Sequence, residues 1–535
     1  MADFPKSVQH FIAEFKELIG RSPSPATSYI PRPYRNAVIR ARDCEIEDIE
    51  LRADIAINQA KLNVFKFPAN YLPGCDLLSD SGTTTMTIQQ WSQLLLGDEA
   101  YGSNEGYFKL QQQISNTFGE RWYCKEKQLT YDGSTRYFDD REKRADFFIF
   151  HQGRSAEFAF FNTLIRSLDV KPAASKASNN WDRSEFHYII PSNGHFDTTE
   201  DNIHAAGIFP ENLQDKSDIN FRGNMDLDRL EQLLFEAGDR VPLVYITITN
   251  NTGGGQPVSM ANLKAARLLT EKYDVPLFID ACRFAENAFF IKRREAGYES
   301  RTITEITHEA FENADGFHIS FKKDGLVNIG GGLAIHRDGL FSEKYPDFTE
   351  ALNDHQILVE GHPTYGGLAG RDIMALLEGL RTVVREGYLA HRIGQVERFG
   401  EALEARGIPV MTPFGGHAVY IDMDQFFGFD RSRDPEFRGI SFTALMLIAG
   451  HRLCELGIFA FDKQWVTGDI DDPEKRVNNV RCAIPRLAYE DQDLLACAEA
   501  IALLYNQRDR IPGVNVDFGL DKTLRHFKAD FSFRK

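Results

Sequence analysis

The sequence predicts an α/β protein with a larger domain built on a mostly parallel β-sheet and a smaller α+β domain. Two observations predict this class. In the middle of the chain, helical patterns alternate with short apolar runs rich in β-branched and aromatic residues, at 243–249, 276–280 and 316–320. Strand, helix and strand at this spacing are typical of right-handed βαβ units. After about residue 370, long helical segments dominate, with a few expected strands at 417–423 and 479–484.

The N-terminal part is expected to form an arm over residues 1–35. Residues 1–20 have the apolar spacing of an amphipathic helix. A connector is expected next, because helices and central strands do not tolerate closely spaced prolines. Four prolines fall in this stretch: Pro23, Pro25, Pro31 and Pro33.

The rest of the chain is expected to divide into two domains. The larger covers residues 86–369 and carries the parallel sheet, whereas the smaller combines residues 36–85 with 370–535. Two segments of the larger domain are expected to be surface insertions. One, at 120–146, is dense in charged and aromatic residues, and the other, at 171–183, is short of large apolar residues.

Helices are expected after the first two apolar runs. Ser259 follows the first run and is a suitable N-cap, because its hydroxyl can accept a hydrogen bond from a backbone N–H of the first helical turn. The second run leads into a helical pattern over residues 281–297. Both helices would cover the sheet and complete the βαβ units.

The overall composition narrows the class of protein. The 535 residues include 78 acidic and 61 basic side chains, for a formal net charge of −17, which argues against a general nucleic-acid binder. We expect neither a signal peptide nor a membrane span, because no stretch approaches the ~18 apolar residues that a span needs. Seven scattered cysteines form no CxxC pair, which is typical of a reduced, cytoplasmic protein.

Polar side chains follow the three predicted strands where each strand ends. Asn250 and Asn251 follow the first, Asp280 closes the second, and residues 320–323 follow the third. In an open parallel sheet, ligands bind beyond the carboxyl ends of the strands. An acid, amides and lysines that converge on one edge are what a cofactor acting as an electron sink would need.

Pyridoxal phosphate (PLP) is such a cofactor. It needs a lysine, a carboxylate against its ring nitrogen, and donors for its phosphate. The pair Lys322 and Lys323 offers the lysine, Asp280 the carboxylate, and residues 151–154 offer backbone N–H groups at a helix start beside a guanidinium. Taken separately, each feature is more often structural or solvated than functional.

Longer motifs add a resemblance to a known family. The sequence is similar to the β-eliminating lyases, which comprise tryptophanase and tyrosine phenol-lyase and are PLP enzymes of fold type I, the aspartate-aminotransferase-like fold. The resemblance runs in order from about residue 33 to 533. The matching segments are LLSDSGTTTM (77–86), GDEAYGSNEGYF (97–108), HQGRSAE (151–157), GGQPVSMANL (254–263), FIDACRFAENAFFIKRREAGYE (278–299), SFKKDGLVNIGGG (320–332) and PTYGGLAGRD (363–372).

The resemblance implies a role for each residue of a cofactor site. Lys323 matches the Schiff-base lysine that also serves as the base for the α-proton, and Asp280 matches the partner of the ring nitrogen. Phe196 matches the aromatic residue stacked on the cofactor ring. Asn251 and Arg283 match groups near the cofactor's 3′-oxygen. The phosphate cup is matched by Gln152, Gly153, Arg154 and Ser320.

The resemblance also implies substrate and cation contacts. Arg481 resembles the arginine that grips the substrate α-carboxylate, for which a planar fork is suited, with Ser79 and Ser81 assisting it. Tyr101 matches the acid that protonates the leaving aromatic carbon. A monovalent-cation site, usually occupied by potassium, is matched by Gly82, Glu99 and Asn328.

Three positions bear on the leaving group. Asp197 and His526 stand where tryptophanases carry Asp and His, and Leu456 stands where phenol-lyases carry an arginine for the phenol hydroxyl. Releasing indole requires protonation of its C3 while the ring N–H has a partner, so an acid/base pair and an apolar slot suit it. The expected reaction is cleavage of L-tryptophan to indole, pyruvate and ammonium, within aromatic amino acid catabolism.

Other functions remain open at this stage. They are β-elimination from tyrosine, a DOPA-like substrate or an S-substituted cysteine, transamination or decarboxylation on the same scaffold, and a non-enzymatic binding role. Phe321 stands where the family usually has Gly or Ala, and a large ring beside Lys323 is expected to reshape the pocket. The family also implies a homo-oligomer, a dimer of dimers.

Overall fold

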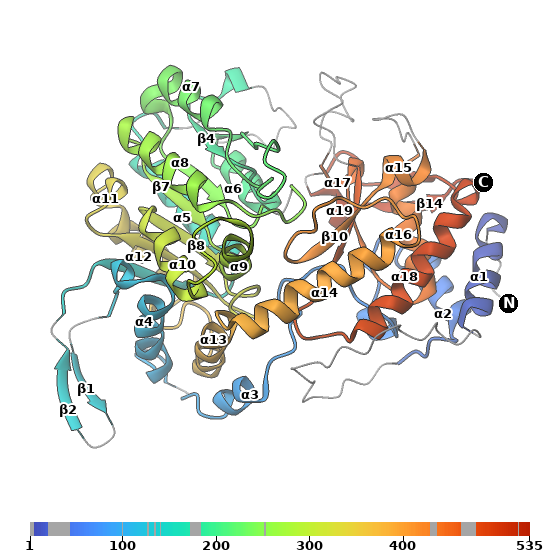
Figure 1. Cartoon of the computed structure of the whole chain (residues 1–535), viewed down its shortest axis with the longest axis horizontal. Helices are drawn as coiled ribbons and strands as arrows, with labels where there is room; N and C mark the ends of the chain where they lie inside the picture. The colour runs from blue at the N-terminus through green and yellow to red at the C-terminus, as the bar shows by residue number, and fades with distance from the viewer. Residues whose placement is uncertain are drawn as a thin grey trace. The chain divides into compact units, whose positions relative to one another are not determined.

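A computed structural model describes most of the chain in two compact units (Figure 1). Unit 1 contains residues 1–80 and 391–535, and unit 2 contains residues 81–390. The second boundary falls inside helix α14 (Glu386–Glu404). The described residues are 5–19, 43–98, 100–125, 128–132, 135–139, 141–171, 183–250, 253–428, 436–461, 478–522 and 524–535. Among their helices, none combines the length and the apolar character needed to cross a membrane.

Unit 2 is built on a seven-stranded sheet in the order β3-β9-β8-β7-β6-β4-β5. All neighbouring strands pair in parallel except β9, which runs antiparallel to both β3 and β8. The strands are β3 (Ala145–Phe150), β4 (Ile189–Ser192), β5 (Phe209–Asn212), β6 (Val244–Thr247), β7 (Leu277–Asp280), β8 (Gly316–Ser320) and β9 (Gly331–His336).

The three predicted runs are confirmed as β6, β7 and β8, and they pair in parallel. Each is fully buried, as expected for a sheet covered on both faces. The predicted helix after Ser259 is α8 (Met260–Lys272), and the Ser259 side chain accepts a hydrogen bond from the Asn262 N–H. The predicted helix after β7 is α9 (Phe284–Arg294).

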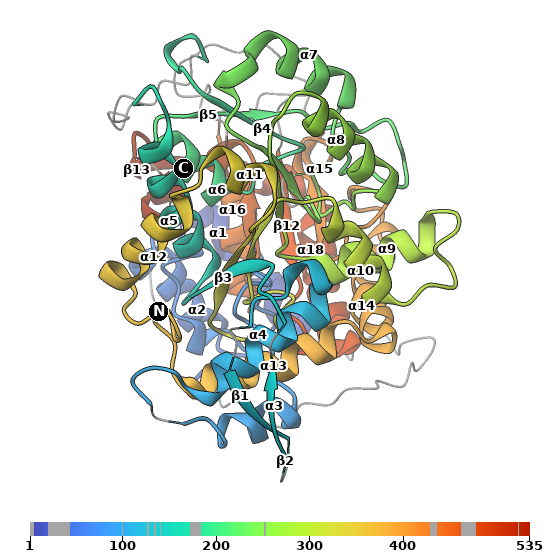
Figure 2. The same ribbon diagram turned by 90° about the vertical axis from the view of Figure 1, so that its left-hand side faces the viewer.

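Helices cover the two faces of this sheet. Figure 2 shows α5, α6, α11 and α12 on one side of it and α8, α9 and α10 on the other. The remaining helices lie before α5, between β5 and β6, or after α12. The bounds not yet given are α3 (Ile88–Leu94), α4 (Glu105–Phe118), α5 (Gly153–Ser167), α6 (Asp197–Ala205), α7 (Leu227–Ala237), α10 (Ile303–Glu312), α11 (Leu340–Lys344), α12 (Phe348–Val359) and α13 (Gly370–Val383), with 3-10 turns at Glu120–Trp122, Arg183–Glu185 and Gly238–Arg240.

The two predicted insertions differ in what the structure describes. Within 120–146, β1 (Gln128–Asp132) and β2 (Thr135–Asp139) pair as an antiparallel hairpin that projects from the body of unit 2 (Figure 1). Most of the second insertion, residues 172–182, lies outside the described residues.

Unit 1 combines a three-stranded antiparallel sheet with a helical core. The sheet has the order β10-β12-β11, and a second pair is formed by β13 and β14. Its strands are β10 (Ala418–Asp422), β11 (Cys454–Leu456), β12 (Asn479–Ala483), β13 (Val514–Phe518) and β14 (Asp530–Phe533). Its helices, besides part of α14, are α1 (Lys6–Ile19), α2 (Ile49–Asp54) with a π-helical turn at Ile55–Gln59, α15 (Met423–Phe427), α16 (Arg438–Ala449), α17 (Ile458–Phe461), α18 (Asp491–Asn506) and α19 (Arg525–Lys528), with 3-10 turns at Ala69–Tyr71 and Arg508–Arg510.

The predicted N-terminal helix is α1, and its apolar stripe belongs to the core of unit 1. Val8, Phe11, Ile12 and Phe15 follow the i, i+3, i+4, i+7 spacing of one helix face. All four are buried. They pack in the same cluster as α16, whose residues from Gly439 to Ala449 are all buried.

Candidate active site

The carboxyl ends of β7 and β8 bring three predicted site residues together in unit 2. Asp280 is the last residue of β7, Ser320 is the last of β8, and Lys323 follows three residues later. The Lys323 N–H donates to the Ser320 carbonyl oxygen over 3.3 Å, so a tight turn holds the lysine at the strand end. Asp280 and Lys323 are 2% and 6% exposed, respectively.

The start of α5 lies directly against the end of β8. Gln152 is extended and precedes the helix, which begins at Gly153. A Cβ atom added to Gly153 would come within 2.6 Å of the Ser320 Cβ, so only glycine permits this approach. The first N–H groups of α5 and the Ser320 side chain therefore share one small region, which suits a phosphate.

Positive charge gathers at the same place. Burial lowers the pKa of Lys322, and the neighbouring charges of Lys323 and Arg154 lower it further. Arg154 itself is exposed in the first turn of α5. Like charges this close repel one another, and a bound dianion beside the helix N-terminus would compensate them.

Phe196 lies beside the candidate lysine. It precedes α6 as the N-cap residue, and the Lys323 Nζ lies 5.1 Å from the centre of its ring. Phe196 is half-buried, so one part of the ring remains accessible. Asp197, the next residue, is also half-buried, and its Oδ1 accepts a hydrogen bond from the Thr198 N–H over 2.7 Å.

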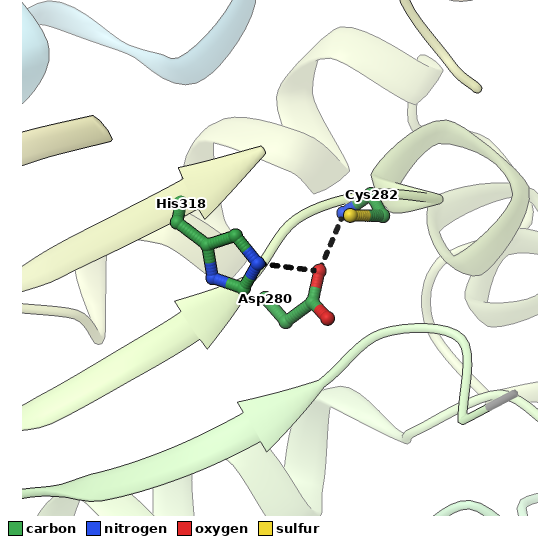
Figure 3. Close-up of side chains that lie close together, drawn as sticks. All are labelled: Asp280, Cys282 and His318. Atoms are coloured by element: carbon green, nitrogen blue, oxygen red, sulfur yellow. Dashed lines mark hydrogen bonds and ion pairs between the residues drawn. The ribbon is translucent and has the colours of Figure 1, made fainter. Parts of the chain in front are cut away.

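Asp280 is fixed by its own strand and by the neighbouring strand. Its Oδ1 accepts a hydrogen bond from the Cys282 N–H over 3.1 Å and lies 3.6 Å from the His318 Nε2, as Figure 3 shows. Asp280 and His318 are partners in the parallel register of β7 and β8, so both side chains emerge on the same face of the sheet.

The candidate groups for the cofactor's 3′-oxygen are only partly described. Arg283 is 2% exposed at the start of α9, and its N–H donates to the Ile248 carbonyl oxygen over 3.1 Å. Asn251 lies outside the described residues. Its neighbour Asn250 is fully buried, and its side chain donates to the Asn193 carbonyl oxygen and accepts from the Gly253 N–H, each over 2.9 Å.

Two of the three predicted cation ligands lie together. The Asn328 Nδ2 donates to the Gly82 carbonyl oxygen over 2.9 Å, and the Gly82 N–H donates to the Lys322 carbonyl oxygen over 2.7 Å. Gly82 has a positive φ of 72°, and a Cβ there would lie 3.0 Å from the Asn328 carbonyl oxygen, so a side chain at this position would be strained. Glu99 lies outside the described residues.

Ser81 also belongs to unit 2, where it is half-buried just before Gly82. Tyr101 is 79% exposed, with its ring 6.1 Å from that of His362 and 5.9 Å from that of Tyr365. An acid that protonates a bound substrate works best when it is shielded from water. Among the described residues of unit 2 in a single chain, Tyr101 has no such shielding.

The other predicted substrate contacts belong to unit 1. Arg481 lies on β12, is 7% exposed, and donates from Nη2 to the Leu78 carbonyl oxygen over 2.9 Å. The segment that carries Ser79 therefore runs beside this guanidinium. The segment is anchored one residue further on, where Asp80 pairs with Arg486 over 2.9 Å in the interior.

The two remaining leaving-group positions are also in unit 1. His526 is 7% exposed on α19, with its ring 5.6 Å from Phe65 and 4.2 Å from Phe527. Leu456 ends β11 and is 6% exposed. Asp197 belongs to unit 2, so its expected pairing with His526 remains a prediction.

Phe321 packs against two glycines at the start of β9. It is fully buried, and Cβ atoms built on Gly330 and Gly332 would lie 3.3 Å and 3.1 Å from it. The Gly332 position is also approached by Phe147, so the ring of Phe321 packs over the glycines of β9. Whether the ring also reshapes the pocket beside Lys323 stays a prediction.

The donor set fits PLP. A buried lysine and a buried carboxylate end adjacent strands, and the glycine at the start of α5 leaves room for an anion beside Ser320. Three cations converge there. These are the groups that a phosphate, a ring nitrogen and an aldehyde require.

Sequence reasoning missed three residues behind Asp280. Glu157 lies on α5, one turn after Gly153, and the His318 Nε2 lies 2.9 Å from its Oε1. The Tyr245 hydroxyl lies 2.6 Å from the His318 Nδ1. A polar residue two positions before Ser320 in an otherwise apolar strand was the available signal, because that spacing puts both on one face.

The fold and the site together define a class, the PLP-dependent enzymes of fold type I. The family model for beta-eliminating lyases matches residues 76–500, and the chain belongs to that family.

Several relatives cover most of the chain. A tryptophanase of Salinibacter ruber is 38% identical over 479 residues, which cover 88% of this chain and 90% of that protein. A tryptophanase of Rhodobacter capsulatus is 38% identical over 465 residues, covering 85% and 89%. A tyrosine phenol-lyase of Fusobacterium nucleatum is 35% identical over 468 residues, covering 86% and 90%. The protein is thus a PLP-dependent carbon–carbon lyase of the tryptophanase and tyrosine phenol-lyase type.

Proposed function

We propose that this lyase cleaves L-tryptophan to indole, pyruvate and ammonium. The observation that carries the proposal is Leu456, which is apolar and 6% exposed where phenol-lyases carry an arginine. An apolar side chain favours an indole ring over a hydroxylated one, because a phenol hydroxyl without a partner is costly to bury. Asp197 and His526, where tryptophanases carry the same residue types, support the same substrate.

The chain's own residues would divide the work as follows. When bound to Lys323, PLP accepts the electron pair released at the substrate's α-carbon. Lys323 takes the α-proton, and Tyr101 delivers a proton to C3 of the indole. Asp197 and His526 hold the indole N–H, while Arg481 grips the α-carboxylate with the help of Ser79 and Ser81.

The remaining cofactor contacts are those that the resemblance to the family implies. Asp280 would hold the pyridine nitrogen and Phe196 would stack on the ring, with Asn251 and Arg283 near the 3′-oxygen. The phosphate would sit against Gln152, Gly153, Arg154 and Ser320. We also infer a potassium ion at Gly82, Glu99 and Asn328, where carbonyl and carboxylate oxygens are suitable hard ligands.

We further infer a cytoplasmic homo-oligomer, a dimer of dimers. The 79% exposure of Tyr101 supports this, because a second subunit could cover the side chain. Light scattering that gave a monomer would contradict the assembly. Exchange of potassium for sodium should lower the activity, and equal rates in both salts would contradict the cation site.

The substrate is tested with a panel of amino acids. Purified protein with PLP is incubated with tryptophan, tyrosine, DOPA and S-substituted cysteine, and pyruvate and the released arene or thiol are assayed. Pyruvate and indole in equal amounts from tryptophan, at the highest kcat/KM, are expected. A higher kcat/KM for another amino acid of the panel would identify that amino acid as the substrate. A keto acid formed only with an amino acceptor would show that the reaction is transamination and not elimination.

The lysine is tested separately. Lys323→Ala should abolish the visible absorption band of the bound cofactor, whereas Lys344→Ala on α11 should retain it. A Lys323→Ala protein with an unchanged band would show that another lysine holds the cofactor.

A further inference from the structure

A buried histidine lies directly behind Asp280. His318 sits in β8, whose other side chains before Ser320 are apolar or absent. It is fully buried, and it faces polar groups on three neighbouring elements. No step of the proposed reaction uses it.

The contacts of His318 link a helix and two strands. Its Nε2 lies 2.9 Å from the Oε1 of Glu157 on α5 and 3.6 Å from the Oδ1 of Asp280 on β7. Its Nδ1 lies 2.6 Å from the hydroxyl of Tyr245 on β6. Figure 3 shows His318 with two of its neighbours, Asp280 and Cys282, which follows just after β7.

These surroundings favour the imidazolium form. Burial opposes the charge of His318, but Tyr245, Asp280, Cys282 and Glu157 together raise its pKa well above its usual value. Burial likewise opposes the charge of Glu157, yet the contacts with His318, Thr199 and Lys323 lower the pKa of Glu157 to about 2.

Two further titratable groups face this cluster, and neither changes its charge near neutral pH. Burial raises the pKa of Tyr245, so its hydroxyl stays protonated. Burial lowers the pKa of His195 to about 4, so that ring stays neutral. The local charges are therefore Glu157 and Asp280 on one side and His318 and Lys323 on the other.

A metal ion is a poorer occupant of this cluster than a proton. Asp280, Cys282 and His318 offer ligand atoms that all lie within 4.8 Å of one another. The Cys282 sulfur, however, accepts a hydrogen bond from the Ser320 N–H over 3.3 Å. The His318 Nε2 lies 2.9 Å from the Glu157 Oε1 and 3.6 Å from the Asp280 Oδ1, and a protonated ring between two carboxylates is stabilised by both charges.

We propose that His318 is a positioning residue for Asp280: its imidazolium ring, with Nε2 close to the carboxylates of both Glu157 and Asp280, orients the Asp280 carboxylate toward the cofactor's ring nitrogen and balances the two buried negative charges. The inference rests on the proposed role of Asp280. It makes His318, Glu157 and Tyr245 a second layer behind the cofactor, which the reaction itself does not require.

Removing the cation of His318 should weaken PLP binding in a pH-dependent way. Without it, Glu157 and Asp280 become two close, buried carboxyl groups, and such a pair takes up a proton at neutral or lower pH. At higher pH both groups ionise again. The defect of a neutral variant should therefore be largest at low pH and should shrink as the pH rises.

The test measures PLP affinity in His318→Gln by equilibrium dialysis at pH 6 and pH 9, without any substrate. The expected result is an affinity about tenfold or more below that of the unaltered protein at pH 6, and nearly equal at pH 9. His336→Gln is the matched control, because His336 is a buried histidine of the adjacent strand β9 whose pKa burial lowers to about 4. It should leave the affinity unchanged at both values.

Equal affinities of His318→Gln and the unaltered protein at pH 6, or a loss of the same size at both pH values, would overturn the proposal. Tyr245→Phe removes only the hydroxyl at Nδ1 and guards against misfolding of the first variant. It should give a loss of the same sign but smaller size, and no loss would count against the inference. If the unaltered protein itself binds no PLP, the proposed function fails instead.

Discussion

Two buried glutamates, one in each unit, have pKa values that are shifted in opposite directions. Glu157 in unit 2 and Glu455 in unit 1 are 3% and 5% exposed. The pKa of Glu157 is lowered to about 2, whereas burial raises the pKa of Glu455 to about 7. Near neutral pH, the first is a carboxylate and the second is divided between its two forms.

The partners explain the difference. Glu455 accepts hydrogen bonds from the N–H groups of Gly457, Phe459 and Ala460 over 3.0 to 3.1 Å. These bonds and the charge of Arg525 lower its pKa, but burial outweighs them. Glu157 instead has an imidazolium 2.9 Å away and two threonine hydroxyls. A cation in direct contact compensates desolvation better than amide dipoles do.

The largest effect on activity is expected at Asp280, the carboxylate that lies beside His318 and Glu157. Asp280→Asn keeps the shape and removes the charge, so kcat/KM should fall by about 10²- to 10³-fold. Steady-state pyruvate formation measures it. A decrease of less than threefold would mean that the charge of Asp280 has no part in the reaction, and the contrast with unit 1 would lose its functional meaning.

Glu157→Gln should destabilise the protein by about 3 kcal/mol at pH 7, because its lowered pKa is a stability term. The contribution is fully present above the unfolded-state pKa near 4.5 and is lost as the pH falls toward about 2. Denaturant unfolding of the variant and the unaltered protein between pH 7 and pH 3 measures it. A difference that stayed constant from pH 7 down to pH 3 would contradict the assigned cause.

Glu455→Gln should act with the opposite sign. A raised pKa contributes stability below the unfolded-state pKa near 4.5 and loses it as the pH rises through about 7. The neutral variant should therefore be more stable than the unaltered protein by about 3 kcal/mol at pH 8, with little difference at pH 4.5. Thermal unfolding at the two pH values decides this. Destabilisation at pH 8 would show that the carboxylate is better solvated than its burial implies.

The smallest effect on stability is expected from removing a neutral hydrogen-bond donor to Glu157. The Thr199 hydroxyl donates to the Glu157 Oε1 over 2.7 Å, and Thr199→Val removes it with little change of volume. A loss of about 1 kcal/mol is expected at pH 7, well below that of Glu157→Gln. If both variants lost equally, the hydroxyls rather than His318 would be the main partners of this carboxylate. Denaturant unfolding gives the comparison.

The architecture of unit 2 was predictable from the sequence because its strand patterns and helix-capping residues predict the same arrangement. β6, β7 and β8 are apolar runs of the right length, and Ser259 caps the helix between the first two. The family motifs placed Lys323, Asp280 and Gly153, and the structure gathers these three at one end of the sheet.

The layer behind Asp280 was not predictable in the same way. Whether His318 meets Asp280 depends on the register between β7 and β8, and no local pattern specifies that register. The packing partners of Phe321 were unpredictable for a related reason. Gly330 and Gly332 come next to its side chain only because β9 pairs antiparallel with β8.

Helix α1 has a practical consequence for anyone who shortens this protein. Val8, Phe11, Ile12 and Phe15 are buried in the core of unit 1, in the same cluster as α16. An expression product that starts after residue 42 would therefore expose the apolar side chains of α16 and of the other elements in that cluster. Exposed surface of that kind promotes aggregation. The residues of α1 should therefore be kept in any truncated product.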